Sequence, residues 1–198
     1  MLFRSFISGN STMNVCLVRH PKPAVAEGIC YGWTDISLPD KFERDCRLLL
    51  TRLAGWRGKP VYSSPLIRCH EFARLLGPAH CDDRLKEINF GDWEMRRWDD
   101  IDRGKLDEWC ENFVEVAPPG GESFHALQQR AVSFLEDTQA NGVNAAIVVT
   151  HAGVIRALIS YVRGLSLRES FNIDIPFGSV TQLKLDQVRG PSLQSVPA

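Results

Sequence analysis

Two histidines of this sequence each follow directly on a short apolar run. One is His20, with Arg19 beside it, and the other is His151. If both runs are parallel strands of one sheet, their carboxyl ends meet at the same edge, and the two imidazoles reach one crevice. Arg68 follows a third short run and would place a second guanidinium there. Two imidazoles and two guanidiniums in one crevice predict a binding pocket for an anion.

This set of side chains suits the cleavage of a phosphate monoester. The phosphoryl group is a dianion that repels nucleophiles, so a site without a metal needs fixed cations such as arginine on its oxygens. A neutral imidazole can attack phosphorus and hold the phosphoryl group covalently, a role that we assign to His20. The leaving alkoxide then needs a proton from a carboxyl group, for which Glu87 is the candidate. Other acidic residues stay open as alternatives: Asp82, Asp83, Asp92, Glu94 and Glu122.

The other histidines and the aromatic residues have simpler interpretations. A single histidine after a strand is usually a polar residue at the edge of the core, and the pairing of His20 with His151 is what favours catalysis. Three histidines lie in polar contexts and are interpreted as structural: His70, His80 and His125. A group of aromatic residues is expected to form core or lid packing rather than a platform for nucleotide bases: Phe90, Trp93, Trp98 and Trp109.

Strands alternate with helices along the chain, and this alternation must bring the candidate residues together. We expect an α/β fold, a three-layer sandwich with a mainly parallel sheet flanked by helices. The expected strands are residues 15–18, 60–63, 145–150, 171–175 and 179–185. The expected helices are residues 40–56, a helix with Ser64 as N-cap and Pro65 as first residue, 100–113, 122–138, and one from 152 to about 163.

Composition and charge limit the partners of the chain. The 198 residues are 44% hydrophobic, and we expect one domain over residues 13–198 after a flexible extension at 1–12. The net charge of -1 gives no global field toward nucleic acid or an acidic membrane surface. No apolar run is long enough for a membrane span. The six cysteines lack metal-site spacing, which favours reduced thiols and a cytoplasmic protein. Nothing in the sequence indicates an oligomeric state.

Five motifs in order resemble the histidine phosphatase, or phosphoglycerate mutase-like, superfamily. They are Leu-Val-Arg-His at 17–20, Ser-Ser-Pro-Leu-Ile-Arg at 63–68, Leu-Lys-Glu at 85–87 with Gly-Asp-Trp-Glu at 91–94, Gly-Glu-Ser at 121–123, and Val-Thr-His-Ala-Gly at 149–153. The resemblance covers nearly the whole chain from Met13 and implies no metal and no cofactor. By position it implies a nucleophile at His20 and a proton donor at Glu87. The phosphate-contacting residues that it implies are Arg19, Arg68 and His151, and the backbone N–H of Ala152 fits as a further phosphate donor.

A second group of motifs resembles the α-ribazole-5′-phosphate phosphatases of cobalamin synthesis. These are residues 90–96, Trp-Cys at 109–110 and residues 119–124. The substrate rim is assigned to Tyr31, Trp33 and Ser123. The chain departs from the family pattern at three positions, with Pro21 for a glycine, Ala26 for an asparagine and Phe72 for a threonine.

The expected partner is a small-molecule phosphate monoester, and three alternative functions toward it stay open. They are a phosphatase of broad specificity, a phosphotransferase of the mutase kind, and a phosphate-binding protein without activity. The sequence favours a phosphatase, because it retains four residues together: His20, Arg68, Glu87 and His151. It does not identify the leaving group of the substrate.

Overall fold

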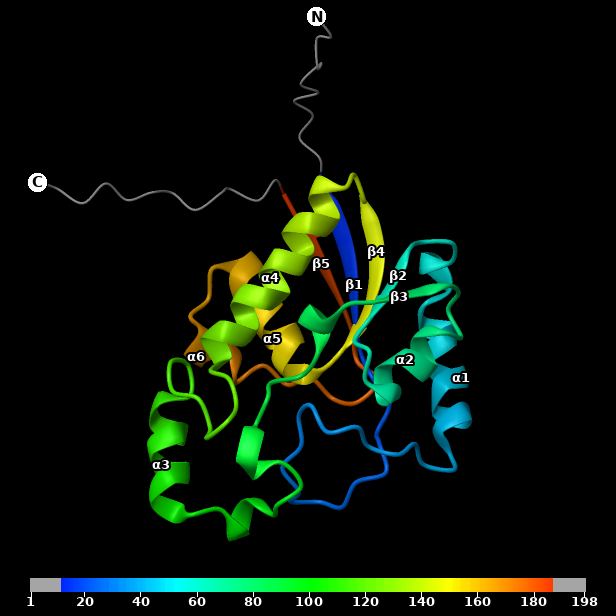
Figure 1. Cartoon of the computed structure of the whole chain (residues 1–198). Helices are drawn as coiled ribbons and strands as arrows, with labels where there is room; N and C mark the ends of the chain where they lie inside the picture. The colour runs from blue at the N-terminus through cyan, green and yellow to red at the C-terminus, as the bar shows by residue number, and fades with distance from the viewer. Residues whose placement is uncertain (1–11, 187–198) are drawn as a thin grey trace, which may run out of the picture.

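The computed structural model describes residues 12–186, which form one central sheet with helices on both faces (Figure 1). Five strands lie in the order β3-β2-β4-β1-β5. All neighbouring strands are parallel except β1 and β5, which are antiparallel. This confirms the expected α/β fold with a mainly parallel sheet. The strands are β1 (Met13–Arg19), β2 (Val61–Ser63), β3 (Ala79–Cys81), β4 (Ala145–Thr150) and β5 (Val180–Leu185).

The two ends of the described range lie next to each other. Thr12 Oγ1 donates a hydrogen bond to Asp186 Oδ1 at 3.3 Å. The extension expected at residues 1–12 lies outside the described residues except for Thr12, and so do the last twelve residues of the expected domain, 187–198. Between Thr12 and Asp186, no helix is both long enough and apolar enough to cross a membrane.

Strands β1 and β4 form the centre of the sheet and lead into the two histidines. Most residues of both strands are buried, as expected for parallel strands covered on both faces. Their register pairs Arg19 with Thr150, so that His20 and His151 leave the sheet at the same level. The N–H of His20 donates to the carbonyl of Thr150 at 3.1 Å, which continues the pairing past the end of β1. The expectation that both histidines reach one edge is confirmed.

Alternating side chains of β1 divide the core into two halves. Cys16 and Val18 pack with the residues of α1 and α2, whereas Val15 and Leu17 pack with those of α4 and α5. Figure 1 shows these two helix pairs on opposite sides of the sheet, which gives the expected three layers. The helices are α1 (Phe42–Arg52), α2 (Ile67–Ala73), α3 (Arg103–Asn112), α4 (Phe124–Ala140), α5 (Ala152–Arg163) and α6 (Leu167–Ser170).

The helix that carries Arg68 begins later than expected. It starts at Ile67 instead of at Pro65. The reason is that Ser64 continues the hydrogen bonding to β4 past the end of β2, because its N–H donates to the carbonyl of Val149 at 3.0 Å. Strand pairing with β4 therefore outcompetes the helix cap and keeps Ser64 at the sheet edge beside the histidines.

The strand expected at residues 171–175 is not formed, and that prediction was wrong. The segment is a turn that continues from α6, in which the N–H of Ile173 donates to the carbonyl of Ser170 at 3.1 Å. Its apolar residues serve packing instead of strand pairing, since the rings of Phe171 and Phe113 lie 4.5 Å apart between centroids. An apolar run this short does not distinguish a strand from a packed turn.

Apart from β3, the other elements differ from expectation only in extent. The helix expected at 40–56 ends at Arg52 and is followed by a 3-10 turn, Ala54–Trp56. The helix expected at 100–113 begins at Arg103, after the N-cap Asp102. Strand β3 was not expected, because its three residues are partly or fully exposed and show no alternation.

The Trp-rich segment between β3 and α4 lies beyond the carboxyl ends of the strands (Figure 1). Its aromatic side chains form a cluster. Trp98 is stacked on Trp109 with 6.2 Å between ring centroids, and the ring of Phe90 meets Trp98 edge-on at 5.3 Å. Trp93 contacts Trp109 edge-on at 5.7 Å and is 3% exposed. These residues form the packing that the sequence predicted, and they close one side of the region beyond the sheet.

Candidate active site

A cavity of about 220 Å³ opens at the carboxyl ends of β1 and β4. Most of the residues that the sequence singled out line it, although they come from five separate stretches of the chain: Arg19, His20, Tyr31, Arg68, Glu87, His151 and Ala152. The rings of His20 and His151 meet edge-on with 5.1 Å between centroids. The fold thus assembles two imidazoles, two guanidiniums and one carboxylate around a single space.

The imidazole of His20 is held in one tautomer. Its Nδ1 lies 2.7 Å from the carbonyl oxygen of Pro21. A carbonyl can only accept, so Nδ1 carries the proton and Nε2 keeps its lone pair in the neutral ring. The side chain is 2% exposed, and burial, followed by the charge of Arg68, lowers the pKa of His20 well below its ordinary value. His20 is therefore a neutral imidazole with a nucleophilic Nε2.

The imidazole of His151 is oriented differently and its Nε2 is engaged. That atom lies 2.9 Å from Ser64 Oγ and 3.4 Å from Cys69 Sγ. Burial, followed by the charge of Arg68, lowers the pKa of His151 as well. The hydroxyl group at the edge of β2 thus holds this second histidine against the first.

The two arginines are anchored by backbone carbonyls. Arg68 is fully buried and donates through Nη1 to the carbonyl of Thr34 at 2.9 Å and through Nη2 to that of Gly32 at 2.5 Å. Arg19 donates to the carbonyl of Ile175 at 2.5 Å. Among the described residues, the Nε atoms of both arginines have no acceptor. Buried donors without an acceptor are rare in folded proteins, so these guanidiniums are suited to an anion.

Glu87 presents its carboxylate to the cavity from an irregular segment. Oε1 accepts from the N–H of Ile88 at 3.0 Å, and Oε2 accepts from the N–H of Gly153 at 3.2 Å. A Cβ atom at Gly153 would lie 2.2 Å from Glu87 Oε1, so only glycine at this position leaves room for the carboxylate. Because Gly153 belongs to the first turn of α5, its N–H has no partner within the helix and is free to bind Glu87.

The structure separates Glu87 from two of the alternative acids. Glu94 accepts from the backbone N–H groups of Trp33 and Thr34. Burial raises the pKa of Glu94, but hydrogen bonds, led by the Thr34 hydroxyl, outweigh burial and hold it below its ordinary value. Glu122 forms an ion pair with Arg130. Of these three carboxylates, Glu87 alone lines the cavity.

This geometry agrees with the relationship of the sequence to known proteins. Residues 15–196 match the family described as the histidine phosphatase superfamily, branch 1. The chain belongs to the histidine phosphatase superfamily. It is a phosphatase, and several of the relatives that match it are named phosphatases.

Three known proteins show how close the relationship is. The adenosylcobalamin/alpha-ribazole phosphatase of Salmonella typhimurium is 31% identical over 158 residues, which cover 75% of this phosphatase and 78% of that protein. Phosphoserine phosphatase 1 of Hydrogenobacter thermophilus is 24% identical over 192 residues, which cover 92% of this phosphatase and 91% of that protein. The crystal structure of the alpha-ribazole phosphatase from Shigella flexneri matches with a TM-score of 0.79 and 26% identity. The match covers 88% of this phosphatase and 92% of the Shigella chain. The expected fold of the phosphoglycerate mutase type is confirmed.

The phosphatase has a further cation in the cavity that sequence reasoning missed. Arg156 lines it from α5, with Nε donating to the carbonyl of Ile173 at 2.9 Å. Its two Nη atoms have no acceptor among the described residues. The signal in the sequence was spacing, because Arg156 follows Ala152 by one helical turn and therefore lies on the same face of α5.

Aromatic residues form much of the rest of the cavity wall. Besides Tyr31, five rings line it: Phe90, Trp98, Trp109, Phe124 and Phe171. Phe90, Trp98 and Trp109 were expected to form core or lid packing, and Phe124 and Phe171 were not expected at the cavity. They pack against one another and also face the space beside the cationic residues, so the cavity of the phosphatase has one charged end and one aromatic side.

Two of the predicted rim residues lie elsewhere. The indole Nε1 of Trp33 donates to the backbone carbonyl of Glu87 at 2.7 Å, and Trp33 is not among the residues that line the cavity. Ser123 caps α4, where its hydroxyl accepts from the N–H of Ala126 at 3.2 Å. Tyr31 does line the cavity, with Arg68 Cζ 5.3 Å from its ring centroid.

The departures from the family pattern leave the assembled site intact. Pro21 has no N–H but keeps the carbonyl that accepts from His20. Phe72 is fully buried in the core on the α1 and α2 side of the sheet. Ala26 is exposed and lies outside the cavity.

The phosphatase is expected to lose stability as the pH falls below about 6.5. In the unfolded chain both histidines titrate near that pH, whereas burial lowers the pKa of His20 and of His151 in the folded state. The unfolded state then binds more protons, and each histidine removes up to about 1.4 kcal/mol per pH unit. Urea unfolding between pH 7.5 and 5.5 measures this loss. In the His20→Ala variant, the free energy of unfolding should fall less steeply with falling pH. An equal dependence on pH in both proteins would contradict the lowered pKa of His20.

Proposed function

We propose that this phosphatase hydrolyses phosphate monoesters through a phosphohistidine on His20, and that its substrate is of the α-ribazole 5′-phosphate type. The observation that carries the proposal is the cavity itself, in which a cationic end with a free imidazole Nε2 continues into an aromatic wall. The cationic end suits the phosphoryl group, and the wall suits a planar aromatic ring on the leaving group.

The reaction proceeds in two displacements. The lone pair of His20 Nε2 attacks phosphorus, the bond from phosphorus to the ester oxygen breaks, and protonated Glu87 transfers its proton to that oxygen. Water then attacks the phosphohistidine, Glu87 takes a proton from the water, and the phosphorus–nitrogen bond breaks to release inorganic phosphate. The hydrogen bond from Nδ1 to Pro21 supports the positive charge that develops on the ring during the first step.

The charged residues of the cavity stabilise the transferring group. Arg19 and Arg68 bind the equatorial oxygens, and the N–H of Ala152 at the start of α5 adds a backbone donor. His151 completes the set from the other side of the nucleophile. These groups supply the charge stabilisation for which other phosphatases use a metal. The residues that the structure describes include no cluster of three or more His, Cys, Asp or Glu side chains able to hold a metal ion.

The aromatic wall favours a ribosyl benzimidazole over a small alcohol. Stacking of an aromatic ring on a protein ring contributes about 1–3 kcal/mol. Trp98 is half-buried, so part of its ring is accessible from the cavity. Two of the related proteins described above are named alpha-ribazole phosphatases.

O-Phosphoserine is a second candidate, and Arg156 is the observation that favours it. Its unpaired Nη groups in the cavity could bind the carboxylate of an amino acid leaving group. A related protein of Hydrogenobacter thermophilus is named phosphoserine phosphatase 1. The two candidates thus depend on different residues of the same wall.

A comparison of kcat/KM over a substrate panel in the presence of EDTA tests the proposal. We expect the highest value for α-ribazole 5′-phosphate. Trp98→Ala should raise its KM about 10-fold and leave O-phosphoserine nearly unaffected. Arg156→Ala is the matched control, since it should affect O-phosphoserine more strongly. Preference for O-phosphoserine would overturn the substrate assignment, and interconversion of 3- and 2-phosphoglycerate without phosphate release would overturn hydrolysis.

The free thiols support a reducing compartment for this enzyme. All six cysteines lie within the described residues and are free, four of them buried. Burial raises the pKa of Cys16, Cys30 and Cys46 to about 12, which keeps these thiols protonated and unreactive. We infer a cytoplasmic enzyme with a small-molecule substrate, formed as one domain over residues 13–198.

A further inference from the structure

The segment that carries Glu87 has no regular structure of its own. It runs from the 3-10 turn Asp83–Leu85 to the 3-10 turn Gly91–Trp93. Backbone carbonyls in such a segment need partners from elsewhere. Leu85 finds one in Thr150 Oγ1 at 2.7 Å, in the residue before His151. The other carbonyls around Glu87 are bound mainly by one side chain.

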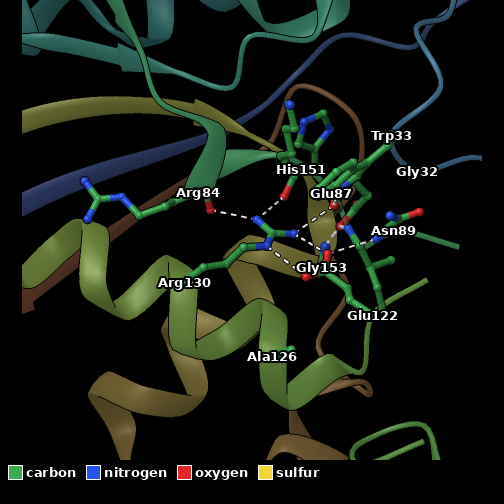
Figure 2. A network of polar contacts seen from close by, with 12 residues as sticks. Gly32, Trp33, Arg84, Glu87, Asn89, Glu122, Ala126, Arg130, His151 and Gly153 are labelled. Atoms are coloured by element: carbon green, nitrogen blue, oxygen red, sulfur yellow. Dashed lines mark hydrogen bonds and ion pairs between the residues drawn. The ribbon is translucent and has the colours of Figure 1, made fainter. Parts of the chain in front are cut away.

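That side chain is Arg130, which reaches the segment from the middle of α4 (Figure 2). Its Nη1 donates to the carbonyls of Arg84 and Lys86, each at 2.7 Å. Its Nη2 donates to the carbonyl of Glu87 at 2.9 Å. One rigid guanidinium therefore fixes three of four consecutive residues, including the residue whose carboxylate lines the cavity.

Glu122 completes the arrangement by binding both Arg130 and the far side of the segment. Its Oε1 lies 2.6 Å from Arg130 Nη2, and its Oε2 lies 3.0 Å from Arg130 Nε. The same Oε1 accepts from the N–H of Asn89 at 2.9 Å. The two side chains are only 16% and 17% exposed. This ion pair is bidentate, so it has one defined geometry that it imposes on residues 84–89.

Among the described residues, neither Arg130 nor Glu122 forms a hydrogen bond to Arg19, His20, Arg68 or His151, the residues proposed to bind or receive the phosphoryl group. The pair instead binds the backbone on both sides of Glu87. The Glu87 carbonyl accepts from Arg130 and also from Trp33 Nε1 at 2.7 Å. The carboxylate of the same residue accepts from Ile88 and Gly153. With the carbonyl held from α4 and the carboxylate held from α5, Glu87 has little freedom to leave the cavity.

We propose that Arg130 and Glu122 are positioning residues for Glu87, holding its carboxyl where it protonates the leaving oxygen. The inference rests on the proposed function, because it presupposes that Glu87 is the acid. Proton transfer requires the two heavy atoms within about 3 Å, and a displacement of about 1 Å can cost 10²-fold in rate. Loss of the pair should therefore slow the protonation of poor leaving groups, while the nucleophile and the phosphate-binding residues keep their places.

Arg130→Lys is the decisive variant. Lysine keeps the charge beside Glu122 but lacks the planar fork that spans three carbonyls and a carboxylate. We expect kcat to fall about 10-fold on the best alkyl phosphate of the panel, and less than about 3-fold on p-nitrophenyl phosphate, whose leaving group needs little protonation. Glu122→Gln should shift the same ratio by a smaller amount, because the amide retains one acceptor for Asn89.

Arg84→Lys is the matched control. Arg84 belongs to the same junction with α4, but its side chain binds Asp82 and Asp137 and does not contact Glu87. This variant should keep the wild-type ratio of the two substrates. If both arginines only stabilise the packing of residues 84–89 against α4, then Arg130→Lys and Arg84→Lys should each lower kcat on the alkyl phosphate and on p-nitrophenyl phosphate alike. That result would overturn the positioning role.

A double variant separates this inference from the function on which it rests. If Arg130 acts through Glu87, adding Arg130→Lys to Glu87→Gln should cause no further loss on the alkyl substrate. Full additivity would overturn the inference alone. If Glu87→Gln by itself shows no dependence on the leaving group, the acid role of Glu87 fails first. Should Arg130→Lys prove unfolded by circular dichroism, Glu122→Gln provides the same comparison.

Discussion

His20→Ala is expected to abolish turnover and to prevent the appearance of acid-labile phosphate on the protein. His20 has a buried, neutral imidazole whose Nδ1 is committed to Pro21, which leaves Nε2 for attack. His151 cannot replace it, because its Nε2 is engaged by Ser64. Loss of a covalent nucleophile typically lowers kcat by about 10⁴-fold or more. Steady-state kinetics and labelling from a ³²P-phosphomonoester measure the two losses.

His80→Ala is the matched control for this experiment. His80 is an exposed residue of β3 and lies outside the cavity. That variant should turn over at the wild-type rate. Undiminished labelling in His20→Ala would mean that another group forms the intermediate, and unlabelled but active His20→Ala would mean that water attacks the ester directly.

Glu87→Gln should be the second most damaging change, and its effect should depend on the leaving group. Glutamine keeps the shape of the side chain but has no transferable acid proton. We expect kcat on an alkyl phosphate to fall about 10²-fold or more, and a clearly smaller loss on p-nitrophenyl phosphate, whose phenolate departs without help. Rapid-quench measurement of phosphoenzyme formation from the activated ester should show that the first step persists.

Glu87→Gln also removes one local hydrogen bond besides the acid proton. Both carboxylate oxygens accept from backbone N–H groups, of Ile88 and Gly153. The amide nitrogen of glutamine cannot accept, so one of these bonds is lost as well. Asp92→Asn is a suitable control, since Asp92 is an exposed neighbouring carboxylate that does not line the cavity. Equal losses on both substrates would show that Glu87 orients the cavity or serves the water step instead of acting as the acid.

Much of the architecture could be predicted because it depends on local pattern. The runs that became β1 and β4 are almost continuously apolar, as strands buried on both faces must be, and their ends place His20 and His151. Parallel strands in one sheet necessarily bring those ends to one edge. The 171–175 segment was mistaken for a strand because a short apolar run serves packing and pairing equally well.

The choice among the acidic residues required the tertiary structure. Glu87, Glu94 and Glu122 lie within one stretch of the sequence and cannot be distinguished by type or spacing. Their roles differ because Glu94 is bound by the backbone of Trp33 and Thr34, and Glu122 by Arg130. Trp33 and Thr34 are 61 and 60 residues from Glu94, so no local pattern indicates these contacts. Arg130 is only eight residues from Glu122, but Glu122 lies before α4 begins, and the fold decides that the two side chains meet.

The sequence by itself determined the family, the sheet, and the set of cations and imidazoles that meet at its edge. Only the tertiary structure decided which tautomer His20 adopts, that Arg156 and the aromatic rings share the cavity, and that Trp33 and Ser123 lie outside its lining. The physical reason is the range of the interactions. Periodicity and strand ends are encoded by neighbouring residues, whereas an irregular segment such as the one bearing Glu87 takes its shape from hydrogen bonds to Arg130 on α4, a helix far along the chain.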